Sequence, residues 1–145
     1  MGLKLITQIT ISQEAGITSI QGVAGYAAIS VGPKVAMYQY DDRAKLLRVI
    51  AEYEGKTFTT CITPMRGFMV CGDYLRGLSF VRFKEDEKEE SRKKTIDLMA
   101  EENSYSSVTA TEFWIDESRP ELHFLGLLAG DTKGFIQIFA YFLDS

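Results

Sequence analysis

Apolar positions along the chain occur in short runs, and glycine, proline or aspartate separates one run from the next. The runs are rich in Val, Ile, Thr, Phe and Tyr, which is typical of β-strands, and helix signals are almost absent. The gaps between runs are mostly short, as antiparallel hairpins require. The pattern predicts an all-β chain with strands at about Leu3–Ile11, Ile17–Val23, Tyr26–Val31, Lys34–Tyr40, Lys45–Tyr53, Thr57–Thr63, Phe68–Gly72, Leu78–Lys84, Lys94–Met99, Val108–Ile115, His123–Gly130 and Phe135–Leu143.

Three segments repeat one pattern, namely "AAISVGPKVAMYQY", "FMVCGDYLRGLSFVRF" and "GLLAGDTKGFIQIFAY". Each has small or apolar residues, then a turn at Gly32, Gly72 or Gly130, then a strand with aromatic residues near its end. The strands after these turns begin roughly 40 to 60 residues apart, and repeats of about 40 to 50 residues with four strands each are typical of β-propeller blades.

The strands that follow the glycine turns are apolar on both faces. In "LSFVRF" and "FIQIFAYF" apolar residues occupy odd and even positions alike. An antiparallel sheet with one face in water would alternate apolar and polar residues, whereas an inner strand of a propeller is packed between two blades. The sequence therefore predicts a fragment of a β-propeller with WD40-like, irregular repeats and about three four-stranded antiparallel blades.

The blade boundaries follow from the strand order. Residues 3–11 are expected to be the last strand of one blade, 17–53 and 57–99 two full blades, and 108–143 a partial blade, all within a single propeller fragment over 1–145. Closed propellers usually have four to eight blades. We therefore expect a segment of a larger protein, which in isolation self-associates through exposed blade edges.

Composition narrows the functional classes. The 145 residues carry a net charge of −4, which argues against a sequence-independent grip on nucleic acid, and no apolar run is long enough to span a membrane. Cys61 and Cys71 form no CxxC motif, and His123 is the single histidine. Buried free thiols in a reducing compartment are favoured over a disulfide, and no metal site is expected.

Two interpretations compete for Asp73 and Arg76 in the central repeat. They are either an acid and its partner (or a phosphate clamp), or parts of a turn in which glycine permits unusual backbone angles and aspartate bonds its own backbone. The pair Gly72-Asp73 recurs as Gly130-Asp131, which favours architecture. Because the chain has no P-loop, nucleophile elbow or paired carboxylates, we expect no catalytic residues, no cofactor and no enzyme activity.

Candidate partner contacts remain at two places. Tyr74 and Arg76 are expected to project from the central turn, and Tyr105 is a second aromatic residue expected in a turn. The run "KEDEKEESRKK" is balanced in charge and is expected to be a solvated loop, with a phosphate contact at its end as the minor alternative. The contact candidates, all from sequence position, are Tyr74, Arg76, Arg92, Lys93 and Lys94.

The repeat signatures also carry a family resemblance. "ISVGPKVAMYQYDDRAKLLRV" and "FMVCGDYLRGLSFVRFKED" resemble the C-terminal propeller region of the cleavage and polyadenylation specificity factor A subunit family, with a likeness from about 3 to 141. That family also includes the large damaged-DNA-binding subunit and the propeller subunit of splicing factor 3b. Gly77 departs from the serine usual in the family. The matching positions are Gly32, Lys34 and Val35 in the first signature, and Gly72, Asp73, Arg76 and Leu78 in the second.

The resemblance implies a non-enzymatic, multi-propeller scaffold of the nucleus. Its partners would be other subunits of a pre-mRNA 3′-end cleavage and polyadenylation complex, with RNA contact mainly through the assembled complex and none with membranes. The alternatives are a related scaffold of a ubiquitin-ligase and DNA-damage complex or of a splicing complex. An unrelated propeller enzyme is a third reading, but no polar set recurs at the strand starts to serve a central channel.

Overall fold

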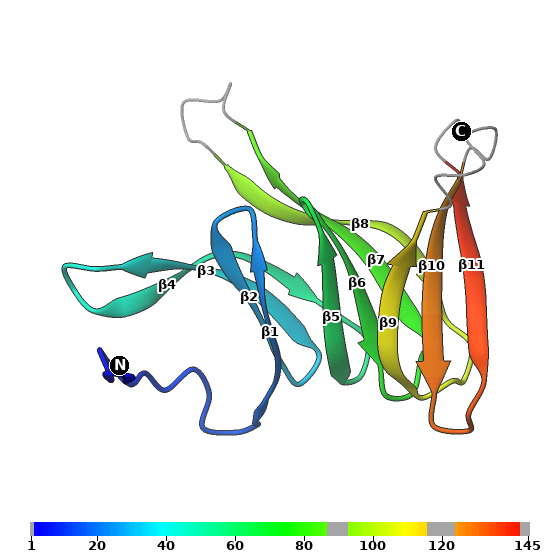
Figure 1. Ribbon diagram of the computed structural model, residues 1–145, viewed down its shortest axis with the longest axis horizontal. Helices are drawn as coiled ribbons and strands as arrows, with labels where there is room; N and C mark the ends of the chain where they lie inside the picture. The colour runs from blue at the N-terminus through cyan, green and yellow to red at the C-terminus, as the bar shows by residue number, and fades with distance from the viewer. Residues whose placement is uncertain (1, 87–92, 116–123, 143–145) are drawn as a thin grey trace.

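A computed structural model describes residues 2–86, 93–115 and 124–142, which form eleven strands and no helix (Figure 1). No helix in this part of the chain is long and apolar enough to cross a membrane. Each strand lies where the sequence predicts one. The strands are β1 (Ile17–Val23), β2 (Tyr26–Val31), β3 (Lys34–Asp41), β4 (Leu46–Glu54), β5 (Thr59–Met65), β6 (Phe68–Asp73), β7 (Leu78–Glu85), β8 (Lys94–Glu102), β9 (Val108–Trp114), β10 (Phe124–Asp131) and β11 (Ile136–Phe142).

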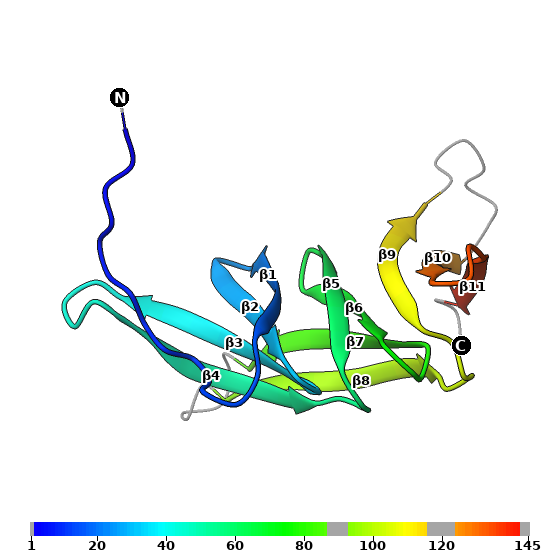
Figure 2. The same ribbon diagram turned by 90° about the horizontal axis from the view of Figure 1, so that it is seen from below.

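The strands form three antiparallel sheets, which we call blades 1, 2 and 3. Their orders are β1-β2-β3-β4, β5-β6-β7-β8 and β9-β10-β11. Neighbours in each sheet are neighbours in sequence and pair in antiparallel fashion. The first strands of the blades lie side by side, with β5 between β1 and β9, and the later strands extend away from them (Figure 2). This arrangement confirms the predicted all-β propeller fragment.

Blade 2 is packed on both faces, as the two-parity pattern predicts. Along β6, Met69 and Cys71 face blade 1, whereas Val70 faces blade 3. On β7, Phe80 packs toward blade 3 and Val81 toward blade 1. All five side chains are at most 4% exposed, so both faces of the sheet are apolar and buried. Burial of this kind stabilises the fold by about 25 cal/mol for each Å² of apolar area.

The two cysteines lie on opposite faces of blade 2. Cys61 pairs with Gly72, and Cys71 pairs with Ile62, so the thiols occupy adjacent rungs of the ladder and point apart. Both are free, as expected. Burial in the core between blades 1 and 2 raises the pKa of Cys71 to about 12, so this thiol stays protonated at neutral pH. Among the described residues there is no cluster of metal-ligating side chains.

The predicted strand Leu3–Ile11 is absent from the structure. Leu3, Leu5 and Ile6 are 106%, 75% and 60% exposed, and no described strand pairs with them. The prediction is wrong for this structure because strand propensity is local, whereas a strand also needs a hydrogen-bonding neighbour. Ile11 alone packs against the outer face of blade 1. The assignment of this segment to a preceding blade stays a prediction.

Candidate functional site

The turn between β6 and β7 is closed by its own backbone and by Asp73. The Asp73 amide donates to the Gly77 carbonyl over 2.8 Å. Oδ1 of Asp73 accepts the amides of Leu75 and Arg76, each at 2.9 Å. Gly77 has φ of +69° and its Cβ, if present, would collide with the carbonyl oxygen of Glu102. The turn therefore requires glycine at this position.

Asp73 also holds the linker between blades 1 and 2. Its Oδ2 accepts the amides of Thr57 at 2.9 Å and Phe58 at 3.0 Å. Asp73 is only 4% exposed. Burial disfavours the charged carboxylate, but the four backbone N–H bonds outweigh burial and lower the pKa of Asp73 below its ordinary value. An ionised carboxylate with both oxygens bonded to the backbone is a structural clamp, which supports the architectural interpretation over an acid–base role.

A second clamp, at Lys56, was not found by sequence reasoning. Its ammonium donates to the carbonyls of Arg76 at 2.7 Å, Leu78 at 2.8 Å and Glu102 at 2.7 Å. Three acceptors satisfy the three donors of the ammonium. Burial lowers the pKa of Lys56. The lysine thereby fixes the linker to the β6–β7 turn and to the end of β8. No local sequence pattern around Lys56 predicts these contacts.

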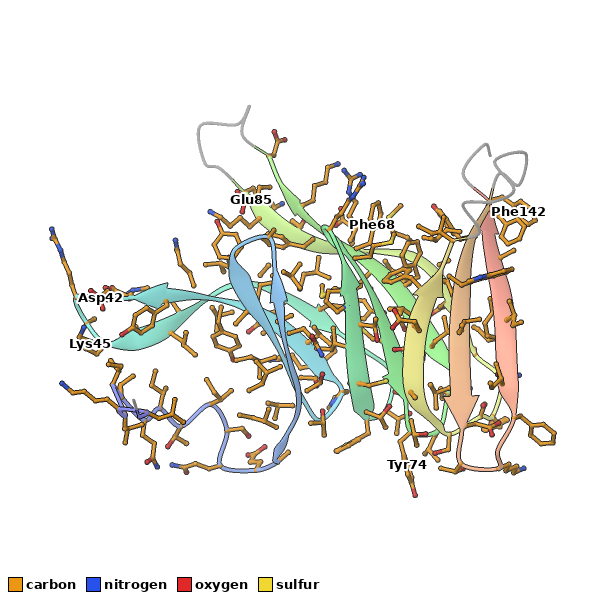
Figure 3. The ribbon with its side chains drawn as sticks, in the orientation of Figure 1. Asp42, Lys45, Phe68, Tyr74, Glu85 and Phe142 are labelled. Atoms are coloured by element: carbon orange, nitrogen blue, oxygen red, sulfur yellow. The ribbon has the colours of Figure 1, made fainter. Side chains whose placement is uncertain are left out.

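Tyr74 and Arg76 project from this braced turn. Tyr74 is 52% exposed and points away from the strand ends at one edge of the molecule (Figure 3). The Arg76 guanidinium lies 4.5 Å from the centroid of the Tyr105 ring, and its Nη2 donates to the Tyr105 hydroxyl at 3.3 Å. Tyr105 is 83% exposed. The structure thus brings together three side chains that sequence position predicted to be accessible, from two different turns.

Tyr74 and Tyr105 border an open groove of about 400 Å³ between blades 2 and 3. Lys133 and Phe135 of the β10–β11 turn line its other side. Arg76 and Lys133 form no ion pair within the described residues. Asp131 is the one acidic residue among the described residues that line the groove, and its carboxylate accepts the amides of Lys133 and Phe135. We call the exposed set Tyr74, Arg76, Tyr105, Lys133 and Phe135 the turn patch.

Comparison with known families decides the identity at family level. The chain matches the family described as "CPSF A subunit region" over residues 3–143. This chain belongs to the CPSF A subunit family. The match confirms the resemblance seen in the two hairpin signatures. None of the curated proteins matches the chain.

Gly77 is the position at which this chain departs from the serine expected of the signature. Its left-handed backbone and the nearby Glu102 carbonyl leave no room for a side chain in this turn. Of the other signature positions, Gly72 pairs with Leu78 across the β6–β7 hairpin, and Arg76 donates its amide to Asp73.

The remaining candidates of this CPSF A region lie elsewhere. Lys93 and Lys94 stand at the start of β8, where the Lys93 carbonyl accepts the Asp86 amide at 3.0 Å. Glu85 in the same hairpin and Tyr74 lie at opposite edges of the molecule (Figure 3). The two lysines are therefore not part of the turn patch. Arg92 and His123 lie outside the described residues.

Proposed function

We propose that the chain is a non-enzymatic scaffold segment of a nuclear pre-mRNA 3′-end cleavage and polyadenylation factor, of the large-subunit type. The observation that carries the proposal is the family match over 3–143. The buried carboxylate of the Gly-Asp signature supports it, because Asp73 is committed to four backbone amides and has no proton to exchange. The signature residues Gly72, Asp73 and Arg76 form the β6–β7 turn, and exposed side chains of this turn are part of the turn patch.

The turn patch is the proposed docking surface for another protein subunit. Tyr and Arg are the residue types that most often dominate binding energy at protein interfaces. Hydrogen bonds with Asp73 and Lys56 already order the backbone of this turn. Less conformational entropy is therefore lost when a partner binds. The Arg76 guanidinium is already ordered on the Tyr105 ring. The patch is therefore preorganised, as a permanent scaffold contact requires.

RNA contact is proposed to arise mainly from the assembled complex. The turn patch has two cations, Arg76 and Lys133, and the chain as a whole has a net charge of −4. Tight binding to a phosphate backbone needs several cationic contacts. A titration of single-stranded RNA at low and high salt tests this directly. Tight binding by the isolated chain at low salt would contradict the proposal.

Affinity purification tests the scaffold role. Tagged chain is incubated with nuclear extract from its own organism, and co-purified proteins are identified by mass spectrometry. We expect 3′-end processing subunits. Two interface residues worth about 1 to 2 kcal/mol each imply that the double variant Tyr74→Ala/Arg76→Ala loses roughly 30-fold or more of that binding. Recovery of ubiquitin-ligase or splicing subunits instead would assign the chain to a related scaffold.

A matched control separates the patch from general damage. Arg43 is exposed in the β3–β4 turn, and its side chain, like those of the patch, carries no ion pair among the described residues. The variant Arg43→Ala is expected to bind as the unmodified chain does. Equal binding by the double variant and by Arg43→Ala would contradict the role of the patch. A hydrolase activity abolished by Asp131→Asn would contradict the non-enzymatic assignment.

A further inference from the structure

The groove between blades 2 and 3 has a floor that both neighbouring turns hold in place. Residues 104–107, in the linker between β8 and β9, line it. The Gly77 amide of the β6–β7 turn donates to the Ser106 carbonyl at 3.1 Å. The Thr132 amide of the β10–β11 turn donates to the Ser107 carbonyl at 3.0 Å. The backbone of the floor is therefore fixed before any ligand binds.

Large apolar side chains line both sides of the groove and remain accessible. Tyr74 and Leu75 lie on the blade 2 side and Phe135 on the blade 3 side, and they are 52%, 47% and 64% exposed. Tyr105 adds a third accessible ring from the linker. Exposed apolar side chains gathered at one place mark an interaction site. The groove therefore suits a ligand with at least one apolar or aromatic side chain.

Two cations at this groove have no acidic partner in the described part of the chain. Lys133 lines the groove, and Arg76 belongs to the same turn as Tyr74. The ion pairs of the described residues involve neither side chain. The Arg76 guanidinium uses one donor for the Tyr105 hydroxyl, which leaves further N–H groups for a ligand. The charge at the groove is therefore complementary to carboxylates.

The acidic side chains of the adjoining turns and linker are bonded to the backbone instead. Asp131 accepts two amides of its own turn. Glu102 accepts a backbone amide of the linker at 2.8 Å. Asp73 is buried beneath the β6–β7 turn and accepts four amides. None of the three pairs with either cation, so the carboxylates that would neutralise the cations must come from a ligand.

Single-stranded RNA is the competing anionic ligand, because its bases can stack on the exposed rings. A phosphate backbone, however, needs several cationic contacts for tight binding. The groove offers two cations, Arg76 and Lys133, on a chain with a net charge of −4. Two cations are enough for a peptide that carries an acidic residue on each side of an apolar one. The number of cations therefore favours an acidic peptide over RNA.

We propose that this groove binds an extended acidic segment of a partner protein. An apolar or aromatic side chain of the segment lies between Tyr74 and Phe135, and its carboxylates pair with Arg76 and Lys133. Recognition of acidic motifs by clustered cations is a recurring mode of peptide binding. The inference rests on the scaffold function proposed above, and it adds the chemistry of the partner segment that the turn patch recognises.

Selection from a displayed library of random peptides tests the ligand chemistry. On the immobilised chain we expect enriched peptides to have acidic residues on both sides of an aromatic or large aliphatic residue. On the double variant Arg76→Glu/Lys133→Glu the same peptides should be lost and peptides rich in lysine and arginine should replace them. No enrichment on the unmodified chain, enrichment without an acidic excess, or the same peptides on both proteins would each overturn the proposal.

Affinity measurements with the best selected peptide locate the site. Lys133→Glu is expected to weaken binding about 10-fold or more, because it places like charges opposite each other. Arg43→Glu is the control, since it changes the net charge equally on an exposed residue of the β3–β4 turn. Asp42 and Lys45 of that turn lie well away from Tyr74 (Figure 3), so we expect unchanged binding. Equal losses in the two variants would overturn the groove as the site.

Competition separates this proposal from RNA binding and from the proposed function. Oligouridine that displaces the selected peptide better than unlabelled peptide does would assign the groove to RNA and overturn the proposal. In nuclear extract, excess peptide is expected to release the co-purified subunits. Retention of 3′-end processing subunits in the presence of the peptide would overturn the acidic ligand but keep the scaffold function. Release of splicing subunits would support the acidic ligand and contradict the proposed function.

Discussion

The chain contains two Gly-Asp turns that are alike in sequence but differ in the hydrogen bonds that their aspartates accept. Gly72-Asp73 ends β6 of blade 2, and Gly130-Asp131 ends β10 of blade 3. Asp73 receives four backbone amides, two from its own turn and two from the linker before its blade. Asp131 receives two, both from its own turn. One aspartate joins blades, whereas the other shapes a single hairpin.

The difference lies in how the linker before each blade meets the turn. In blade 2 the linker amides of Thr57 and Phe58 donate to the Asp73 carboxylate. In blade 3 the contact runs through the backbone instead, because the Thr132 amide donates to the Ser107 carbonyl at 3.0 Å. The same dipeptide therefore has a different role in each blade.

The largest expected effect is removal of the shared carboxylate. Asp73→Ala leaves four amides without their acceptor and is expected to lower the free energy of unfolding by about 3 kcal/mol. Asp131→Ala frees two amides in an exposed turn and should cost about 0.5 to 1 kcal/mol, as lost caps and turn bonds do. Urea unfolding of the two variants measures the contrast, and equal losses would contradict it.

Lys56 gives the next effect. Lys56→Met keeps much of the side-chain packing but leaves three carbonyls without the ammonium, and we expect a loss of about 2 kcal/mol in the free energy of unfolding. Lys133→Met, in the turn of blade 3, has no described hydrogen bond or ion pair from its side chain to lose and is expected to stay within about 0.5 kcal/mol of the unmodified chain. The same urea series measures both variants. An unchanged free energy of unfolding in Lys56→Met would show that the Lys56 hydrogen bonds do not stabilise the fold.

We expect replacement of the glycine to cost more stability in the blade 2 turn than in the blade 3 turn. A Cβ at Gly72 would lie 2.8 Å from Cys61 Sγ and 2.8 Å from Val108 Cγ1, whereas a Cβ at Gly130 would meet nothing closer than 3.9 Å. Gly72→Ala is expected to destabilise by about 1.5 kcal/mol through overpacking. Gly130→Ala should be neutral or stabilise by about 0.5 kcal/mol through the unfolded state. Thermal unfolding curves that rank the variants in the opposite order would refute the packing described between blades 2 and 3.

The smallest effect is a pH dependence. The folded pKa of Asp73 is below its unfolded value of about 3.9, so its ionised form stabilises the fold fully above that pH. This contribution is lost as pH falls through the folded pKa. The stability gap between the unmodified chain and Asp73→Asn is therefore expected to be constant from about pH 7 to 5 and to shrink below about pH 4. Unfolding of both proteins measured at pH 7, 5 and 3 tests this prediction. A stability gap that widens in acid would contradict a lowered pKa of Asp73.

Sequence reasoning succeeded where the signal is local. Strand parity and glycine turns placed eleven strands, and the recurrence of Gly-Asp favoured a turn over an acid–base pair. It failed where the partner is distant. Lys56 bonds carbonyls 20 to 46 residues away, and Leu3–Ile11 has strand propensity without a neighbouring strand. Exposure of Tyr74 and Arg76 followed from their turn, but the stacking of Arg76 on Tyr105 depends on how two turns meet.

Amide hydrogen exchange tests the central contrast most directly. In the unmodified chain the amides of Thr57, Phe58, Leu75 and Arg76 should exchange slowly and as one set, because a single carboxylate holds them all. In Asp73→Asn we expect all four to exchange faster, while the amides of Lys133 and Phe135 respond to Asp131→Asn alone. Fast exchange of Thr57 and Phe58 in the unmodified chain, with Leu75 and Arg76 still protected, would contradict the claim that Asp73 joins the linker to the turn.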